Sequence, residues 1–418
     1  MGATFDREGD ARLMRILWVK ANKILPVHSG GDIRSFNLLR QLVRRDEVTF
    51  LSYYDGARDP AYEAELEKQL PGCVCVCTGK RLESGWARGW DYLQRLPDAT
   101  PYAVGRFASQ AVRERLQNVL QQKNPEVVIC DFLDAAINFP DALPIPSVLF
   151  QHNVESEIWR RHAENGSGWA MKVVYRREYS KMLRYEQAAV RRFHHVIAVS
   201  EHDRKLMSAW VESERITVVP TGVDKDEFSP GETGQEKPLA VFVGAMDWEP
   251  NVDAAQYFCA DIWPRILARV PQAKFRIVGR NPERRVEALA GGPVEVTGRV
   301  ASVVEHLREA AVVVVPLRVG GGTRLKIYEA MAMGKAVVST TVGAEGLDVH
   351  HGKDVLLADS PDGFADSVIA MLEDAEVRRR LGGAAAELAA KYAWPVIGER
   401  FGEVLRRVVG QQVALAAS

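Results

Sequence analysis

The sequence has no hydrophobic run of membrane-spanning length. A helix that crosses a bilayer needs about 18 or more consecutive apolar residues, and no stretch of the 418 residues supplies them. The N-terminal residues, MGATFDREGDARLM, are polar and acidic, unlike the apolar core of a secretory signal. Asp6 stands where a myristoylation signal requires Ser or Thr. We therefore expect a cytoplasmic protein.

The chain also lacks a surplus of either charge. Its 54 Lys and Arg residues nearly balance its 55 Asp and Glu residues, which gives a net charge of -1. A dedicated nucleic-acid-binding protein normally carries a visible basic surplus. We therefore expect no nucleic-acid partner, and any basic surface should be local.

Cysteine is scarce, and its spacing is not that of a metal site. Three of the five cysteines, Cys73, Cys75 and Cys77, alternate in CVCVC, so on a strand they would face one side. Zinc ligands and disulfide pairs are spaced differently, so we expect buried strand cysteines and no bound metal. Asp224 and Asp226 form an Asp-x-Asp triplet, for which a solvated turn is the expected structure.

What the chain does have is length and a regular alternation of patterns. At 418 residues it exceeds one typical hydrophobic core, which favours two domains. Short runs such as EVVICDF and AVVVVPL are apolar on consecutive residues, as in strands covered by helices on both faces. Amphipathic helices are predicted between such runs, among them 32–45, 252–270 and 323–333. The alternation predicts an α/β fold with doubly wound parallel sheets.

The polar segment 221–238, rich in Gly and Pro, marks the predicted domain boundary. It separates a Rossmann-like domain at 12–220 from a second one at 239–391. A C-terminal helix at 392–418 is expected to cross back towards the N-terminal domain. Open α/β sheets bind ligands beyond the carboxyl ends of their strands, so two parallel sheets facing a central cleft would hold a substrate between the domains.

The segment VGGGTRLKIYEAMAMG places glycines at a predicted strand–helix junction. Gly320, Gly321 and Gly322 let a ligand approach the backbone, and Thr323 is a suitable N-cap for the helix that follows. Free N–H groups and the positive dipole end at such a helix start favour a bound phosphate. An ordinary glycine-rich turn is the alternative interpretation. Three charged residues follow: Arg324, Lys326 and Glu329. The two basic residues favour an anionic ligand, and the glutamate could accept hydrogen bonds from its hydroxyl groups.

Four segments, taken in order along the chain, resemble the family 4 glycosyltransferases of the GT-B type. They are SGGDIRSFNLLRQL, PSVLFQHNVES, VIAVSEHDRKLM with ITVVPTGVDKDEF, and GGGTRLKIYEAMAMGKAVVSTTVGAEGL. Within the family the chain is similar to bacterial enzymes that build exopolysaccharides or related surface glycans. The resemblance implies a UDP- or GDP-linked sugar donor held mainly by the C-terminal domain, an acceptor held by the N-terminal domain, and transfer with retention. It implies no bound metal and no cofactor.

The resemblance is broken where the family holds the donor. Glu329 matches the second glutamate of the family's Glu–seven residues–Glu motif, which binds the nucleotide ribose, but the first glutamate falls on Gly321. The family's basic pair is also missing, since an ungapped match puts Ala245 and Pro250 at those positions. These departures leave open which groups bind the hydroxyls of the donor sugar.

We interpret Arg324 and Lys326 as a relocated diphosphate clamp. Negative charge builds up on the departing diphosphate in the transition state and must be stabilised. The two basic residues lie three and five positions beyond Gly321, beside the N–H groups of the 320–323 turn. Two further donor contacts are predicted in the loop after the next strand: Glu345 and Gly346.

In the N-terminal half, His152 matches the family's sugar-contacting histidine and is predicted to bind the transferred sugar or the acceptor side. Asn153 and Glu155 follow it closely and are predicted to serve nearby. The remaining residues resemble the family's N-terminal glycine loop and its flanks, for which a simple helix start is the alternative: Gly30, Gly31, Asp32 and Arg34.

The acceptor is expected to be a glycan, a lipid-linked sugar or a small molecule. The segment 159–195 interleaves Arg and Lys with Trp and Tyr, which suggests peripheral contact with an anionic membrane leaflet; solvated helix faces are the alternative. Two rival functions stay open. The lost glutamate at Gly321 is compatible with an inactive donor-binding module, and a sugar-nucleotide epimerase on the same fold would need an acid/base pair that the sequence does not identify.

Overall fold

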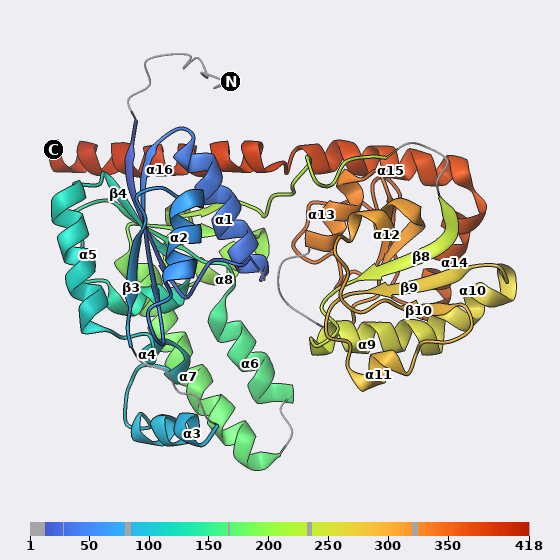
Figure 1. Cartoon of the computed structure of the whole chain (residues 1–418), viewed down its shortest axis with the longest axis horizontal. Coiled ribbons are helices and arrows are strands. Elements are labelled where there is room, and N and C mark those ends of the chain that lie inside the picture. The colour runs from blue at the N-terminus through green and yellow to red at the C-terminus, as the bar shows by residue number, and fades with distance from the viewer. Residues whose placement is uncertain are drawn as a thin grey trace. The chain divides into compact units, whose positions relative to one another are not determined.

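A computed structural model describes residues 13–27, 29–79, 85–165, 168–231, 236–319 and 325–417. The chain forms two compact units (Figure 1). Unit 1 comprises Met1–Val219 and Gly398–Ser418, and unit 2 comprises Pro220–Ile397. The segment 221–238 therefore belongs to unit 2, and most of the C-terminal helix belongs to unit 1.

Unit 1 is built on a seven-stranded parallel sheet in the order β3-β2-β1-β4-β5-β6-β7. Its strands are β1 (Arg15–Ala21), β2 (Glu47–Tyr54), β3 (Val74–Cys77), β4 (Val127–Asp131), β5 (Ser147–Phe150), β6 (His195–Ala198) and β7 (Ile216–Val218). Its α-helices are α1 (Gly30–Val43), α2 (Pro60–Gln69), α3 (Gly85–Gln94), α4 (Tyr102–Gly105), α5 (Gln110–Lys123), α6 (Glu155–Asn165), α7 (Trp169–Arg192), α8 (Glu201–Met207) and α16 (Trp394–Ala417, from Gly398 onward), with 3₁₀ turns η1 (Leu133–Asn138) and η2 (Ser213–Arg215).

Unit 2 is built on a six-stranded parallel sheet in the order β10-β9-β8-β11-β12-β13. Its strands are β8 (Lys237–Val243), β9 (Lys274–Val278), β10 (Val294–Val296), β11 (Ala310–Val315), β12 (Ala336–Ser339) and β13 (Leu356–Leu357). Its helices are α9 (Glu249–Tyr257), the π-helical turn η3 (Phe258–Ile262), α10 (Trp263–Arg269), α11 (Arg284–Glu287), α12 (Val304–Glu309), α13 (Leu325–Ala332), α14 (Pro361–Glu373) and α15 (Ala375–Ala390).

The predicted fold class is confirmed, because both units are parallel, doubly wound α/β domains. In each sheet the strand order reverses beside the first strand, between β1 and β4 in unit 1 and between β8 and β11 in unit 2. Ligands of such sheets bind at the carboxyl ends of the strands at this reversal, the topological switch point. The two switch points are therefore where functional side chains are expected.

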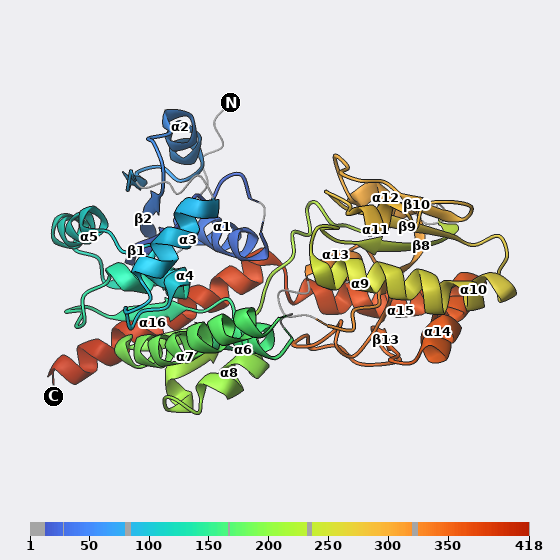
Figure 2. The same ribbon diagram turned by 90° about the horizontal axis from the view of Figure 1, so that it is seen from below.

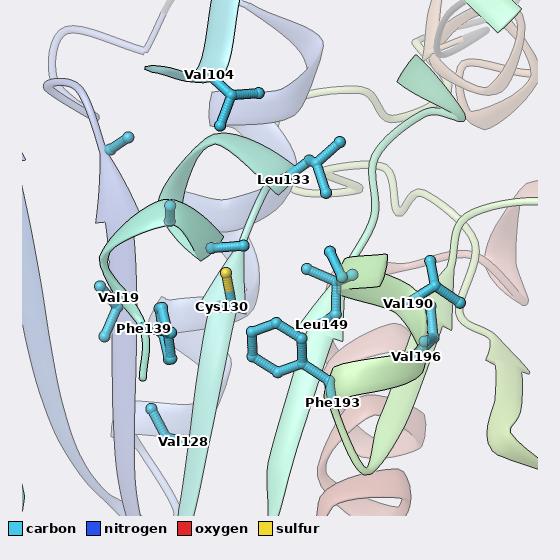
Figure 3. Packing of buried hydrophobic residues seen from close by; sticks show 14 of the residues in the cluster. Val19, Val104, Val128, Cys130, Leu133, Phe139, Leu149, Val190, Phe193 and Val196 are labelled. Carbon is cyan, nitrogen blue, oxygen red and sulfur yellow. The ribbon is translucent and has the colours of Figure 1, made fainter. Parts of the chain in front are cut away.

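The cores form from the continuous apolar runs that the sequence shows. Every residue of β4 and of β11 is buried, as expected for strands with helices on both faces. In unit 1, side chains such as Cys130, Leu149, Phe193 and Val196 gather in one cluster (Figure 3). Helix α16 covers the same sheet through Phe401, whose ring stacks on Trp18 with centroids 5.5 Å apart.

The chain is helical over the predicted range 252–270 apart from its last residue, but two local details differ from the predictions. The helix predicted over 252–270 is interrupted by the π-helical turn η3, which directly precedes Trp263 and Pro264. Proline lacks the N–H that an α-helix needs and its ring collides with the carbonyl one turn earlier, so the wider turn admits it. The cysteines of β3 are only half-buried, because β3 is an edge strand of its sheet.

The two long helices α7 and α16 raise the question of membrane spanning. Both contain 24 residues, but charged residues recur along each of them. Among the helices of the described residues, none is both long enough and apolar enough to cross a membrane.

A pair of neighbouring glycines in α15 yields a stability prediction with its own control. A Cβ on Gly382 would lie 2.0 Å from the carbonyl oxygen of Gly334, the residue that ends α13 with a φ of 68°. A Cβ on Gly383 would meet nothing within 4 Å. We expect Gly382→Ala to lower the free energy of unfolding of unit 2 by about 1–3 kcal/mol.

Gly383→Ala should raise the same free energy by about 0.5–1 kcal/mol, because alanine is the better helix former and meets no obstacle. Urea unfolding followed by circular dichroism measures both. Effects of equal sign at the two positions would contradict the close approach of α15 to the end of α13.

Candidate functional site

In unit 1, buried ionic side chains meet at the switch point of the sheet. Asp131, the last residue of β4, is fully buried. It accepts hydrogen bonds from Trp18 Nε1 at 2.9 Å and from His152 Nε2 at 2.7 Å, and Lys20 Nζ lies 3.6 Å away. Burial alone would raise its pKa, but Lys20 and the bond from His152 lower the pKa of Asp131 to about 2. This carboxylate is therefore ionised and engaged inside the unit.

His152 lies just beyond β5, in the middle of this network. The guanidinium of Arg34 donates to its Nδ1 at 2.6 Å, and since arginine only donates, the ring proton must sit on Nε2, which donates to Asp131. Burial lowers the pKa of His152 to about 3, although Asp131 opposes the shift. The ring is thus neutral with both nitrogens occupied. A sugar contact of the predicted kind would require one of these partners to be exchanged.

An aromatic ring explains why position 31 is a glycine. Phe132, which follows β4 with an unusual φ of 68°, stacks on His152 with centroids 3.7 Å apart. Lys20 Nζ lies 4.1 Å from the same ring. A Cβ on Gly31 would come within 2.2 Å of the Phe132 ring tip, so any side chain there would displace the ring that positions His152.

The predicted glycine loop is the start of a helix. Gly30 and Gly31 are the first two residues of α1, which the side chain of Ser29 caps by accepting from Asp32 N at 3.1 Å. The Asp32 carboxylate also lies 3.3 Å from Lys20 Nζ and stays 22% exposed. The helix-start interpretation therefore holds for this segment, and its N-terminal turn lies beside the His152 network.

Arg34 is not at the surface of this site. Its side chain is fully buried, and burial lowers the pKa of its guanidinium to about 10, with Asp203 and Asp131 opposing the shift. The contact with Nδ1 makes Arg34 a support for His152. A direct contact with a diphosphate would require the buried guanidinium to move.

Two carboxyl groups lie after β4 and β5: Glu155, which the sequence analysis predicted to serve near His152, and Asp134, which it overlooked. Burial, with Asp134 and Glu186 adding to it, raises the pKa of Glu155 to about 8, and burial raises the pKa of Asp134 to about 6. Glu186 accepts from the backbone N–H of Glu155 at 2.8 Å and thereby caps α6. Asn153 lies half-buried between His152 and α6. For Asp134 the available signal was an acidic residue three positions beyond the end of β4.

In unit 2, a lysine reaches across the switch point. Lys326 on α13 donates from Nζ to Asn251 Oδ1 at 2.8 Å, and the same ammonium lies 4.7 Å from the centre of the Phe242 ring on β8. Asn251 is 3% exposed, and its Nδ2 donates to the carbonyl of Ala245 at 2.9 Å. The ammonium group is thus held at the carboxyl end of β8, in the turn where the family's basic pair is missing.

Asn251 is a residue that sequence reasoning overlooked. Its amide folds over Gly244, where a Cβ would lie 2.6 Å from Asn251 Nδ2. A buried polar residue in the first turn of α9 was the available signal, but its partner Lys326 lies 75 positions away. The side chain ties the β8–α9 turn to α13.

Glu329 follows Lys326 by one turn of α13. Burial raises its pKa from 4.5 to about 7, the nearby Glu227 adds to the shift and Lys326 opposes it. Residues three apart on a helix lie on the same face, so a cation and a carboxyl group are adjacent here. A carboxyl group whose pKa lies near neutrality is typical of functional sites.

The structure describes only part of the predicted donor site. Glu345 and Gly346 are exposed in the turn after β12, and Gly346 has a φ of 81°. Lys326 and Glu329 lie at the carboxyl edge of the same sheet. Five predicted residues lie outside the described ranges: Gly320, Gly321, Gly322, Thr323 and Arg324.

Two kinds of known protein match the chain in sequence. The phosphatidyl-myo-inositol mannosyltransferase of Mycolicibacterium smegmatis is 29% identical over 233 residues, which cover 53% of this chain and 59% of that protein. The D-inositol 3-phosphate glycosyltransferase of Corynebacterium glutamicum is 28% identical over 218 residues, which cover 44% and 49%. The chain thus spans less than two thirds of the length of these relatives.

Solved structures match over nearly the whole chain and show its fold. Sucrose-phosphate synthase from Thermosynechococcus elongatus superposes with a TM-score of 0.70 at 17% identity, over 97% of this chain and 100% of that one. HepE of Anabaena in complex with UDP-glucose gives a TM-score of 0.63 at 16% identity, over 94% and 100%.

Family models match both units. The model described as Glycosyltransferase Family 4 matches residues 29–227, and the model described as Glycosyl transferases group 1 matches residues 237–374. The two matches include Arg34, Asp131 and His152 of unit 1 and the Lys326–Glu329 face of α13. With a glycosyltransferase model on each unit and a GT-B fold, the chain belongs to the family 4 glycosyltransferases.

Proposed function

We propose that the chain is a metal-independent, retaining glycosyltransferase that moves a sugar from a nucleoside diphosphate sugar to an acceptor hydroxyl. Family membership and the names of the relatives, which transfer mannosyl or other glycosyl groups, support the reaction class. HepE, which shares the fold, binds UDP-glucose, which supports a UDP- or GDP-linked donor. No cofactor is proposed, and the enzyme acts in the cytoplasm.

The observation that carries the proposal is the fixed ammonium group of Lys326. A departing diphosphate gains negative charge, and a donor group held in place beforehand stabilises that charge without reorganising in the transition state. Asn251 and the Phe242 ring hold this ammonium at the carboxyl end of β8. It thereby lies near the turn in which Ala245 and Pro250 stand at the positions of the family's basic pair.

Glu329 provides the neighbouring contact to the nucleotide. In a nucleoside diphosphate the ribose directly follows the phosphates, so a cation and a carboxyl group one helical turn apart fit the two groups in order. Carboxylate oxygens accept hydrogen bonds from ribose hydroxyls. We assign the diphosphate to Lys326 and the ribose to Glu329. Arg324 and residues 320–323, which lie outside the described ranges, stay predicted from the sequence as the rest of the diphosphate clamp.

The acceptor belongs to unit 1 in this proposal. The neutral ring of His152, fixed by Arg34 and Asp131, is a rigid wall beside the half-buried Asn153 and Glu155. The acceptor is a glycan, a lipid-linked sugar or a small molecule, within exopolysaccharide or surface-glycan synthesis. No covalent nucleophile takes part.

A panel of nucleotide sugars tests the function directly. Release of nucleoside diphosphate on incubation with a donor, alone or with acceptor, supports the transferase. Interconversion of the donor sugar without release would instead identify an epimerase, and tight binding without turnover an inactive donor-binding module.

The first prediction concerns Lys326. We expect Lys326→Ala to lower turnover by about 100-fold or more, the scale of losing one transition-state donor, and Lys326→Arg to restore part of it. Asn251→Ala should lower turnover less, because it frees the ammonium without removing it. Nucleoside diphosphate release under saturating donor measures all three.

The matched control is Lys274→Ala. Lys274 is exposed at the amino end of β9, the opposite edge of the sheet, so its removal should leave turnover unchanged. Near-normal activity of Lys326→Ala in a protein with an unchanged melting temperature would rule the diphosphate clamp out.

The second prediction uses the ionisation of Glu329. Between its ordinary pKa of 4.5 and its folded pKa of about 7, the folded chain binds more protons than the unfolded chain. The free energy of unfolding therefore falls as pH rises through this window. Glu329→Gln removes the titration, so between pH 5 and pH 8 the wild type should lose up to about 3 kcal/mol relative to the variant.

Chemical denaturation of unit 2 across this pH range measures the difference. Glu287→Gln, an exposed carboxyl group on α11, is the control and should follow the wild type. Parallel pH curves for the wild type and Glu329→Gln would show that Glu329 ionises without penalty and would remove the physical basis of its assignment.

A further inference from the structure

Helices α6 and α7 form a hairpin that projects from the carboxyl edge of the unit 1 sheet (Figure 1). Helix α6 starts at Glu155, three residues beyond His152, and α7 returns the chain to β6. At 1.5 Å per residue, the 11 residues of α6 extend about 16 Å beyond the sheet. Helices α6 and α7 lie side by side (Figure 2), and α3 is joined to α7 by the hydrogen bond that Tyr92 donates to the Glu178 carboxylate at 3.4 Å.

Exposed apolar side chains concentrate on these helices. On α7, Trp169 is 82% exposed, Val173 58% and Met171 45%; on α3, Trp90 is 65% and Leu93 54% exposed. Trp169 and Val173 are one helical turn apart and so lie on the same face. Single exposed apolar residues are ordinary, but a group of large ones on adjoining helices indicates an interaction surface.

The solvent-facing side of α7 is cationic. Arg176, Arg177 and Arg184 are exposed and follow Trp169 and Val173 along one face of the helix. The two acidic residues of α7 cannot neutralise them, because both are buried and used inside the unit. These are Glu178, which accepts from Tyr102 N at 2.8 Å, and Glu186, which caps α6.

A cavity of about 420 Å³ opens between α6 and α7 next to this face. In its wall Arg160 forms ion pairs with Glu164, which also lines the cavity, and with Glu157. Lys172 and Arg176, also in the wall, have no ion-pair partner among the described residues. The cavity thus carries one more positive than negative charge, three cations against the carboxylates of Glu157 and Glu164. A net positive charge in a concave site suits one anionic group of moderate size, such as a phosphate ester. The remaining lining residues are Ala163 and Tyr179.

We propose that unit 1 docks on an anionic phospholipid surface through α3 and the α6–α7 hairpin, with one lipid headgroup phosphate in the cavity between α6 and α7. Basic residues interleaved with Trp, Met and Val are the composition of helices that lie in a membrane interface, and each basic residue near such a surface adds about 1 kcal/mol of attraction. Nucleic acid would account for the charge and for the exposed tryptophans, on which bases stack, but not for the exposed Leu93, Met171 and Val173. The docking surface does not depend on the proposed transferase activity.

Vesicle co-sedimentation of the full chain tests this proposal. The wild type should bind vesicles of phosphatidylcholine with phosphatidylglycerol, should not bind phosphatidylcholine alone, and should release with rising salt. Lys172→Gln combined with Arg176→Gln should weaken binding roughly 25-fold, about fivefold for each lost charge. Trp169→Ser should weaken binding and leave the salt dependence unchanged, because it removes no charge.

Arg113→Gln combined with Arg115→Gln is the matched control. Both residues are exposed on α5 in the same unit, so the net charge changes equally while the docking surface stays intact. Unchanged binding of the control supports the proposal. Equal losses in the two double variants, no binding by the wild type, or binding to poly(A) without binding to vesicles would each overturn it. Donor turnover in solution is measured separately, so failure of docking and failure of the proposed function remain distinguishable.

Discussion

The hydrogen bond from Lys326 Nζ to Asn251 Oδ1, 2.8 Å long, is the contact on which the functional interpretation of unit 2 depends. A lysine is a flexible side chain, and ordering it costs entropy that only several contacts together offset. Here the amide of Asn251 and the face of Phe242 supply those contacts before any ligand arrives. The bond between Lys326 and Asn251 also joins α13 to the β8–α9 turn. The geometry of the proposed donor site therefore depends on how these two elements pack. A family member that has lost its usual basic pair can in this way place a cation at the same strand end from another helix.

At the switch point of unit 1, several charged side chains are buried together. Burying Asp131, Lys20 and Arg34 is costly unless each charge is paired, and the neutral ring of His152 links the carboxylate to the guanidinium without adding a charge. Removing one member would leave a buried charge uncompensated. The network is therefore better suited to holding a fixed surface than to shuttling protons, in contrast to the half-buried carboxyl groups of Asp134 and Glu155, whose pKa values lie near neutrality.

Much of the fold could be predicted because its signals are local. Continuous apolar runs mark buried parallel strands, and the order of β and α patterns gives the doubly wound topology. The π-helical turn inside the helix over 252–270 could not be predicted, because the effect of Pro264 on the preceding turn depends on three-dimensional fit. In the candidate sites, too, local signals could be recognised from the sequence and three-dimensional contacts could not. His152, Lys326 and Glu329 could be singled out from motifs, whereas Asp131 and Asn251 could not, since their importance arises from partners 113 and 75 positions away in sequence. The sequence left both a glycine loop and a helix start open for Gly30 and Gly31, and it could not show that the Phe132 ring excludes a side chain at position 31.

The position of the Phe132 ring restricts which substitutions can accumulate at positions 31 and 132. Because a methyl group at position 31 and a phenyl ring at position 132 cannot occupy the same space, position 31 cannot gain a side chain while the phenyl ring is in place. Replacement of the phenylalanine by a smaller residue would first have to open room, and only then would a larger residue at 31 be tolerated; the reverse order would push the ring off His152. Among relatives, the two positions should therefore change together, and lineages that keep the stacked ring should keep the glycine.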